Sequence, residues 1–237
     1  FEALVRWEHP TKGMISPVDF IPIAEETGLI ISIDQWVLAS ACRQLRLWQD
    51  QFPDLGPLTM NVNLSSRHFS QPGLIELLDQ VFAETGLSTS ALKLEITETT
   101  VIKNPETATI ILKQLKDKKI HVCLDDFGTG YSSLSYLHAF QFNTLKIDRS
   151  FVNQLEDSEN NKESVEIVKA IINLGANLGM DVVAEGVETK RQLNQLKALD
   201  CQHAQGYWFS KPMSGTITTN FLLDSLRTKQ NYTQLCP

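Results

Sequence analysis

Long apolar runs are missing from this sequence of 237 residues, and so is any excess of positive charge. No stretch approaches the roughly eighteen apolar residues that a membrane-spanning helix needs. The formal net charge of −7 argues against a protein that binds nucleic-acid polymers, because such binding depends on clustered lysine and arginine side chains. We therefore expect a cytoplasmic chain with no membrane segment among these residues, although it could be the cytoplasmic part of a larger membrane-associated protein.

Cysteine is also scarce, and its four positions are Cys42, Cys123, Cys201 and Cys236. None of them forms a CxxC pair, so we expect neither a zinc site nor a disulfide framework. A glycine-rich phosphate turn after an early strand is absent too, which argues against an open dinucleotide-binding sheet. With 42% hydrophobic and 21% charged residues, the composition is typical of a globular protein with a substantial core.

Seven short segments rich in apolar and β-branched residues predict strands, and helical patterns lie between them. These segments are residues 1–7, 58–65, 92–97, 120–126, 144–148, 180–186 and 203–209. Regular alternation of strand and helix predicts an α/β fold with a parallel sheet. Because seven strands are one fewer than eight and the sequence is strand-like from Phe1, we expect one domain over residues 1–237. We expect this domain to be a TIM-like (β/α)8 barrel whose first strand lies upstream of Phe1.

Two helices have apolar stripes that can be predicted residue by residue. In residues 33–48 the stripe is expected to be Trp36, Val37, Ala41, Leu45 and Trp48, with Asp34 near the start of the helix. In residues 164–179 it is expected to be Ile167, Ala170, Ile171 and Leu174. Residues 153–164 are polar and without a pattern, and they predict a surface loop.

Unexpected polar side chains fall on all seven predicted strands, most of them near the C-terminal end. They are Glu2, Asn63, Glu95, Asp125, Asp126, Lys146, Glu185 and Gln205. In a barrel these strand ends meet at one mouth, where active sites are assembled. Carboxylates brought together repel one another, so a site that holds several should contain cations. Ligation by oxygen alone suits hard ions such as Mg²⁺ or Mn²⁺.

Asp125 and Asp126 are adjacent, whereas neighbouring side chains of a regular strand point to opposite faces. Where the strand gives way to its loop the pleat is broken, so both carboxylates can reach neighbouring ions, with Asp125 as the bridge. Two ions about 4 Å apart would activate a water and clamp both oxygens of a displacement at phosphorus. Lys146 would orient that water or neutralise charge on the pentacoordinate state. These residues therefore suggest phosphodiester hydrolysis.

Eight blocks of the sequence resemble, in order, the EAL domain family of bacterial signal-transduction phosphodiesterases. The blocks are "FEALVRWEHP", "FIPIAEETGLI", "NVNLS", "LEITET", "DDFGTGYSSL", "LKIDRSFV", "AEGVET" and "QGYWFSKPM". Such an ordered series is far more specific than any one short motif. The resemblance implies hydrolysis of cyclic di-GMP to linear pGpG with two ions, Mg²⁺ or Mn²⁺.

The resemblance also implies a role for each matching residue. Ligands of the first ion would be Glu2, Asn63, Glu95 and Asp125, and ligands of the second would be Asp125, Asp126 and Glu185. Lys146 would position the water. The resemblance makes Glu2, Lys146 and Glu185 the expected catalytic residues. Leu4, Arg6 and Gln205 would contact the substrate. Glu98 would anchor the loop after Asp126, with Gly128 and Gly130 supplying its backbone freedom. Glu188 also matches the family pattern, without an assigned role.

The resemblance also implies partners, and the sequence departs from the family pattern in places. Its members commonly dimerise through the loop after the double aspartate and are usually joined to sensory or cyclase-like domains, which we expect upstream of Phe1. The family's first strand, which carries a glutamine that helps bind the substrate, precedes the EAL triplet and is expected there too. Gln141 and Asn143 stand where the family often has proline and aspartate.

Two other functions remain open at this point. One is a receptor or scaffold that binds cyclic di-GMP without cleaving it, against which the retained Glu2, Asp125, Asp126 and Lys146 argue. The other is a metal-dependent enzyme that abstracts a proton beside a carboxylate, with Lys146 as the base. That chemistry does not need a double aspartate.

Overall fold

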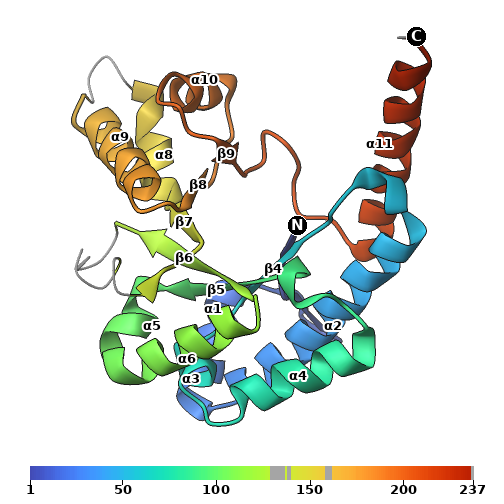
Figure 1. Ribbon diagram of the computed structural model, residues 1–237, viewed down its shortest axis with the longest axis vertical. Coiled ribbons are helices and arrows are strands. Elements are labelled where there is room, and N and C mark those ends of the chain that lie inside the picture. Colours follow the sequence, from blue (N-terminus) through green and yellow to red (C-terminus); the bar gives the residue numbers. More distant parts are fainter. Residues whose placement is uncertain (129–136, 138–139, 158–161, 236–237) are drawn as a thin grey trace. The chain divides into compact units, whose positions relative to one another are not determined.

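The structure is a computed structural model that describes residues 1–128, 137, 140–157 and 162–235 (Figure 1). The chain forms two compact units. The first unit contains residues 1–63, 72–93 and 212–237, and the second contains residues 64–71 and 94–211. In the part of the chain that the structure describes, no helix is long and apolar enough to cross a membrane.

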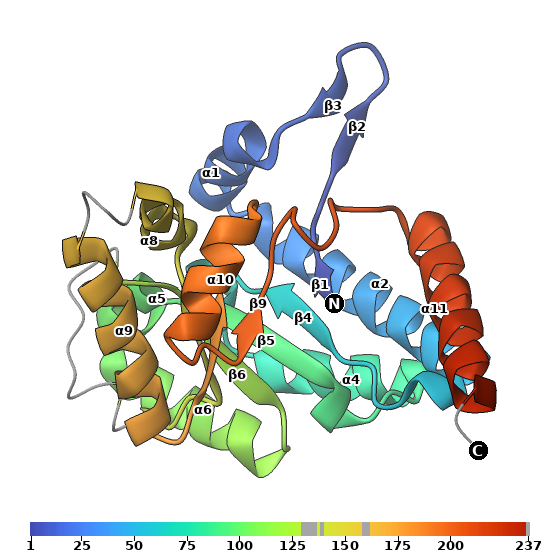
Figure 2. The same cartoon turned by 90° about the horizontal axis from the view of Figure 1, so that it is seen from above.

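The first unit contains one parallel strand pair, one hairpin and several helices. β1 (Glu2–Ala3) runs parallel to β4 (Met60–Asn63). β2 (Trp7–His9) and β3 (Gly13–Ile15) form the antiparallel hairpin visible in Figure 2. The helical elements are α1 (Pro17–Thr27), α2 (Ile30–Gln51), η1 (Pro53–Leu55), α4 (Leu74–Thr85), η2 (Thr89–Ala91) and α11 (Gly215–Leu235). The Trp48 indole donates a hydrogen bond of 2.9 Å to Thr219 Oγ1, which joins α2 to α11.

The second unit is built on parallel strands that pair in chain order. They are β6 (His121–Phe127), β7 (Thr144–Ile147), β8 (Asp181–Ala184) and β9 (His203–Ala204), and β5 (Leu92–Thr97) neighbours β6. The helical elements are α3 (Ser66–Phe69), α5 (Glu98–Lys103), α6 (Pro105–Asp117), α8 (Arg149–Asn153), η3 (Gln154–Asp157), α9 (Lys162–Asn177) and α10 (Lys190–Ala198). The predicted alternation of strand and helix is confirmed.

Burial of the central strands explains why their sequences are almost continuously apolar. All four residues of β7 are buried, and so are Val122, Cys123 and Leu124 of β6. Parallel strands covered on both faces need apolar side chains pointing in both directions. A polar residue within such a strand therefore stands out, and Lys146 in β7 is the clearest case.

The buried stripe of α2 differs from the predicted one. Trp36 is 63% exposed, and the stripe consists of Asp34, Leu38, Ala41, Cys42, Leu45 and Trp48. The helix begins at Ile30, so Asp34 lies inside it rather than at its cap. Burial raises the pKa of the Cys42 thiol to about 11, which fits an unreactive core residue.

The buried face of α9 and the segment before it also differ from the prediction. Ile167 is exposed, and the face that packs inward carries Val168, Ile171 and Gly175. The predicted surface loop at residues 153–164 contains η3, where Leu155 is fully buried, and the first turn of α9. A single apolar side chain among polar neighbours is enough to hold such a turn against the core, and no periodicity marks it in the sequence.

The hairpin of β2 and β3 was not predicted at all. The ring of His9 holds its turn, because Nδ1 accepts hydrogen bonds from the backbone N–H groups of Thr11 at 3.2 Å and Lys12 at 3.3 Å. The Trp7 ring meets the edge of Phe20 in α1 at a centroid distance of 5.6 Å. Side-chain contacts to the turn and to the following helix thus stabilise strands of only three residues.

The turn before β7 accounts for Gln141 and Asn143, which stand where the EAL family often has proline and aspartate. Gln141 has a φ of 52°, a value closed to proline, whose ring fixes φ near about −65°. Its side-chain oxygen accepts a hydrogen bond from the Lys116 ammonium of α6. Asn143 Oδ1 accepts the N–H of Val122 at 2.9 Å. The two residues therefore form a turn that depends on side-chain hydrogen bonds instead of a proline.

A capping box starts α10 and offers a test of local stability. Thr189 Oγ1 accepts the N–H of Gln192 at 3.2 Å, and Gln192 Oε1 accepts the N–H of Thr189 at 3.0 Å. We expect Thr189→Ala to lower the free energy of unfolding by about 1 kcal/mol, because the first turn loses an acceptor. Urea unfolding measures this, with the exposed Lys190→Ala as control. An unchanged unfolding midpoint in Thr189→Ala would contradict the prediction.

Candidate active site

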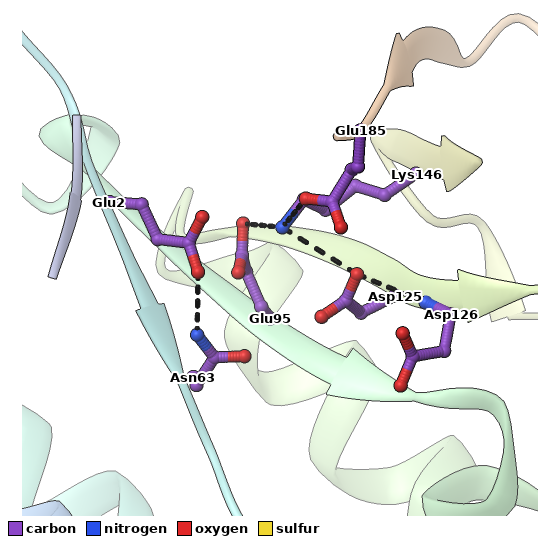
Figure 3. Close-up of polar contacts among 7 residues, drawn as sticks. All are labelled: Glu2, Asn63, Glu95, Asp125, Asp126, Lys146 and Glu185. Atoms are coloured by element: carbon purple, nitrogen blue, oxygen red, sulfur yellow. Dashed lines mark hydrogen bonds and ion pairs between the residues drawn. The ribbon is translucent and has the colours of Figure 1, made fainter. Parts of the chain in front are cut away.

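Four neighbouring strand ends of the second unit place one lysine among three carboxylates (Figure 3). Glu95 comes from β5, Asp125 from β6 and Lys146 from β7, while Glu185 directly follows β8. The Nζ atom of Lys146 lies 2.7 Å from Glu95 Oε1, 2.5 Å from Glu185 Oε1 and 3.5 Å from Asp125 Oδ1. The structure thus brings together four of the residues singled out in the sequence.

Burial makes this network costly to disrupt. Lys146 and Glu95 are each only 1% exposed. A charge in such surroundings is tolerated only when it is paired, and removal of one partner leaves the other uncompensated. The backbone also fixes the group, since Glu185 N–H donates to Ile147 O at 3.1 Å and Leu64 N–H donates to Glu95 O at 2.9 Å. The carboxylates are therefore held in place before any ligand arrives.

A break in the pleat of β6 explains the adjacent aspartates. The pairing of β6 with β7 shifts register between Leu124 and Phe127. Asp126 has a φ of 55°, in the left-handed region that residues other than glycine seldom adopt. The N–H of Asp126 donates to Asp125 Oδ1 at 3.0 Å, so the first aspartate stabilises this turn (Figure 3). An irregular strand end of this kind often re-aims a side chain beside an active site.

Asp148 is a neighbour of this group that the sequence reasoning missed. Its side chain caps α8 by accepting the N–H of Ser150 at 3.0 Å. Desolvation raises the pKa of Asp126, and the charges of Asp125 and Asp148 raise it further, while Lys146 and Arg149 act in the opposite direction. The position of Asp148, two residues after Lys146 on the same strand end, was the available signal.

The raised pKa of Asp126 predicts a pH dependence of the metal-free protein. The folded state keeps this proton at pH values where the unfolded chain has lost it. The resulting stability is present at low pH and is lost as the pH rises from about 4 through the raised pKa. We expect Asp126→Asn to gain stability relative to the unsubstituted protein as the pH increases. Urea unfolding of both proteins in chelator measures this, and parallel pH profiles would contradict it.

Two further candidates lie together in the first unit. Asn63 Nδ2 donates a hydrogen bond of 2.9 Å to Glu2 Oε1 (Figure 3). The parallel register of β1 and β4 pairs Glu2 with Asn61, which places Asn63 just beyond it along the sheet. This hydrogen bond keeps the glutamate side chain oriented. Carboxylate and amide oxygens such as those of Glu2 and Asn63 are the ligands that a hard cation prefers.

The expected substrate contacts are accessible to solvent. Leu4 and Arg6 follow β1, are exposed, and leave an apolar side chain and a guanidinium open to a ligand. Gln205 follows β9, where its N–H donates to Ala184 O at 2.8 Å and its carbonyl accepts the N–H of Val187 at 3.0 Å. Glu188 is exposed, and its N–H donates to Gln192 Oε1 at 2.7 Å at the start of α10.

Glu98 is buried, and its two carboxylate oxygens have no hydrogen-bond partner among the described residues. It lines a mainly apolar cavity with Val101, Ile102, Leu124, Phe127, Leu137, Phe140 and Phe142. Gly128 adopts a φ of 95°, as expected for a position that needs backbone freedom. The other expected loop residue, Gly130, lies outside the described residues.

The donor set suits a hard divalent cation. Oxygens of Glu95, Asp125 and Glu185 all lie within 3.5 Å of one positively charged nitrogen, so their geometry already converges on a centre of positive charge. No histidine or cysteine takes part in that ion-pair network, and such oxygen ligands favour Mg²⁺ or Mn²⁺ over zinc. Over the described ranges, no three acidic, histidine or cysteine side chains form a ready metal cage, and Lys146 supplies the compensating charge instead.

Comparison with known proteins identifies the family. The profile of the EAL domain matches residues 1–212. A relative in Pseudomonas aeruginosa, the bifunctional diguanylate cyclase/cyclic di-GMP phosphodiesterase MucR, is 44% identical over 214 residues, which are 90% of this chain and 30% of MucR. The chain spans about a quarter to a third of the length of the first curated relatives it matches.

Solved structures agree with this match. The PaMucR phosphodiesterase in complex with c-di-GMP is 43% identical, with a TM-score of 0.84 over 90% of this chain and 84% of that one. The EAL enzyme Bd1971 with cAMP and cyclic di-GMP bound is 33% identical, with a TM-score of 0.87 over 93% of this chain and 59% of that one. EAL domains are TIM-like barrels, so the predicted fold class is confirmed. The match spans both compact units, and this chain belongs to the EAL domain family.

Proposed function

We propose that this chain hydrolyses cyclic di-GMP to linear pGpG with the help of divalent metal ions. The observation that carries the proposal is the convergence of Glu95, Asp125 and Glu185 on the buried Lys146 ammonium. EAL domains generally depend on divalent metals, and relatives in the family bind cyclic di-GMP. A chain that keeps these charged residues at their strand ends retains what metal-dependent hydrolysis requires.

The ligands that we propose follow the family pattern. Glu2, Asn63, Glu95 and Asp125 would hold one Mg²⁺ or Mn²⁺ ion, and Asp125, Asp126 and Glu185 would hold the second. When bound, the ions would supply Lewis acidity and would make a water nucleophilic near neutral pH. The left-handed turn at Asp126 supports the bridging role of Asp125, because two consecutive carboxylates can then serve adjacent ions.

The chain's own groups carry the rest of the reaction. The Lys146 ammonium, fixed beside Asp125 and Glu185, donates hydrogen bonds that orient the attacking water and offset negative charge at phosphorus. Water adds to one phosphorus and gives up a proton, the bond from that phosphorus to O3′ breaks, and O3′ takes up a proton and leaves as a hydroxyl, so one water is consumed for each bond cleaved. Leu4 offers an apolar face to the ligand. The Arg6 guanidinium can grip a phosphate, and Gln205 can accept or donate a hydrogen bond.

Glu98 is proposed to anchor the segment that begins at Gly128 and includes Gly130. A buried carboxylate needs hydrogen-bond donors, and the two Glu98 oxygens have none among the described residues. The family pattern assigns the supply of such donors to the segment after Asp126. We expect Glu98→Ala to lower turnover by about tenfold or more, since the strand end at Asp126 loses support. Steady-state kinetics test this, with the exposed Thr99→Ala as control. Equal kinetics for the two variants would count against an anchoring role.

The setting of the site in a longer protein is also part of the proposal. MucR is named as a cyclase and a phosphodiesterase, and this chain corresponds to 30% of its length. We infer that a sensory or cyclase-like domain lies upstream, that the chain is cytoplasmic, and that it forms a homodimer through the loop after Asp126. We also infer that residues 1–237 constitute one EAL-type domain.

Chromatography of cyclic di-GMP and its products tests the proposed reaction. The purified protein should yield pGpG in Mg²⁺ or Mn²⁺ and none in chelator. Cyclic di-GMP that is bound, as shown by calorimetry, but stays intact in both ions would support the receptor function instead. Failure to bind any guanine dinucleotide would favour the proton-abstraction alternative.

A further inference from the structure

Three glycines of the second unit stand directly behind candidate site residues. Gly128 follows Asp126 by two residues, Gly186 follows Glu185 by one, and Gly206 follows Gln205 by one. At each of them a side chain would collide with a neighbouring segment. The backbone at each of these glycines is therefore tightly packed, and the neighbouring segment can affect the position of the site residue.

The support for two of the loops is α8. A Cβ atom at Gly128 would lie 2.9 Å from Cε2 of the Phe151 ring, and one at Gly186 would lie 2.5 Å from Cβ of Arg149. Phe151 and Arg149 both belong to α8, which begins three residues after Lys146. The helix that follows β7 thus packs against Gly128, after the double aspartate, and against Gly186, after Glu185.

α8 is itself well fixed. Val152 of α8 and Leu155 of the next turn are fully buried, and Asp148 caps the helix through Ser150 N–H. The chain that packs on this helix adopts left-handed backbone angles at Asp126 and Gly128, with φ values of 55° and 95°. A helix anchored in the core in this way can set the positions of the two aspartates through its contact with Gly128.

We propose that Phe151 is a positioning residue for the metal-dependent reaction. Its ring packs against Gly128 and so fixes the positions of Asp125 and Asp126 relative to Lys146. The inference rests on the proposed function, since it concerns the same carboxylates. Metal ligands must be held to within about 0.5 Å of their working geometry. Loss of the Phe151 ring should therefore have a large effect on metal binding.

The contact involves the ring itself. The Gly128 backbone meets the Cε2 and Cζ atoms, at 2.9 and 3.1 Å from a built Cβ position, and the next neighbour is Ile171 Cδ1 of α9 at 3.7 Å. Truncation of Phe151 to alanine removes both ring atoms and leaves Gly128 facing a void. Leucine keeps branched carbon atoms near that position and should retain much of the contact.

The test compares Phe151→Ala and Phe151→Leu with Val152→Ala, a buried truncation on the same helix. Mn²⁺ affinity is titrated, and kcat and KM for cyclic di-GMP are measured. We expect Phe151→Ala to weaken Mn²⁺ binding by about tenfold and to lower kcat by about 10- to 100-fold, with KM changed by less than about threefold. Phe151→Leu should restore most of both, and Val152→Ala should lower the unfolding midpoint while keeping Mn²⁺ affinity.

The outcomes separate this inference from the proposed function. Equal loss of Mn²⁺ affinity in Phe151→Ala and Val152→Ala would overturn the positioning role, because general loosening would explain both. Unchanged affinity in Phe151→Ala would overturn it too. If the unsubstituted protein binds Mn²⁺ but hydrolyses nothing, the proposed reaction fails and the affinity comparison still decides the role of Phe151. If it binds no Mn²⁺, both fail.

Discussion

Lys146→Met should destabilise the protein and abolish turnover together. The substitution keeps the volume of the side chain but removes the positive charge that lies 2.7 Å from the buried Glu95 and 2.5 Å from Glu185. Breaking a buried ion pair by removing one partner costs about 3–5 kcal/mol of unfolding free energy. Loss of the charge that stabilises the reacting phosphate should lower kcat by at least about 10²-fold. Urea unfolding in chelator and steady-state kinetics measure the two effects.

Two controls sharpen the Lys146 prediction. Lys169→Met removes an exposed lysine of α9 and should change neither quantity. The double variant Lys146→Met with Glu95→Gln should recover part of the lost stability, because the fully buried Glu95 charge is removed while the partly exposed Asp125 and Glu185 carboxylates remain, and it should stay inactive. A single variant as stable as the unsubstituted protein would mean that the ammonium does not compensate these carboxylates.

Glu2→Gln should remove hydrolysis and leave the binding of cyclic di-GMP largely intact. The amide can still accept the hydrogen bond from Asn63 Nδ2, so β1 and β4 should keep their local arrangement. It replaces a charged oxygen ligand by a neutral one, and a loss of several kcal/mol of metal-derived stabilisation lowers kcat by about 10³-fold. Calorimetry and product chromatography measure the two properties on the same sample.

Glu8→Gln is the matched control for Glu2, since Glu8 is an exposed carboxylate on β2 in the same unit. It should behave as the unsubstituted protein in both assays. Retained turnover in Glu2→Gln would remove Glu2 from the ligand set. In cells, an unchanged signalling output despite lost hydrolysis would favour the receptor function.

The strands that carry the candidate site were accessible to sequence reasoning for a simple physical reason. Parallel strands buried on both faces are almost wholly apolar, so Lys146 within "TLKI" and Glu95 within "LKLEIT" contradict their surroundings. A residue that violates the local pattern is usually there for function. The same argument indicated Asp125 and Asp126, although the left-handed turn at Asp126 that reconciles them with a strand has no signature in the sequence.

Other features escaped because they depend on contacts between distant segments. Trp36 looks like a core residue by type, yet the side of α2 that is buried runs through Leu38 and Cys42. Asp148 carries no motif that distinguishes a helix cap from a group that acts on Asp126. The packing of Gly128 on Phe151 appears only when the loop and the helix are placed together. Composition and periodicity cannot supply such three-dimensional neighbours.

Anomalous scattering from crystals grown with Mn²⁺ and cyclic di-GMP would test the central claim most directly. The account predicts two Mn²⁺ peaks, with Asp125 contacting both and Asp126 contacting one at about 2.0–2.3 Å, and with Lys146 turned toward the scissile phosphate. It would be contradicted by crystals that hold cyclic di-GMP but show no Mn²⁺ peak at these carboxylates, with the Lys146 ammonium still bound to Glu95 and Glu185.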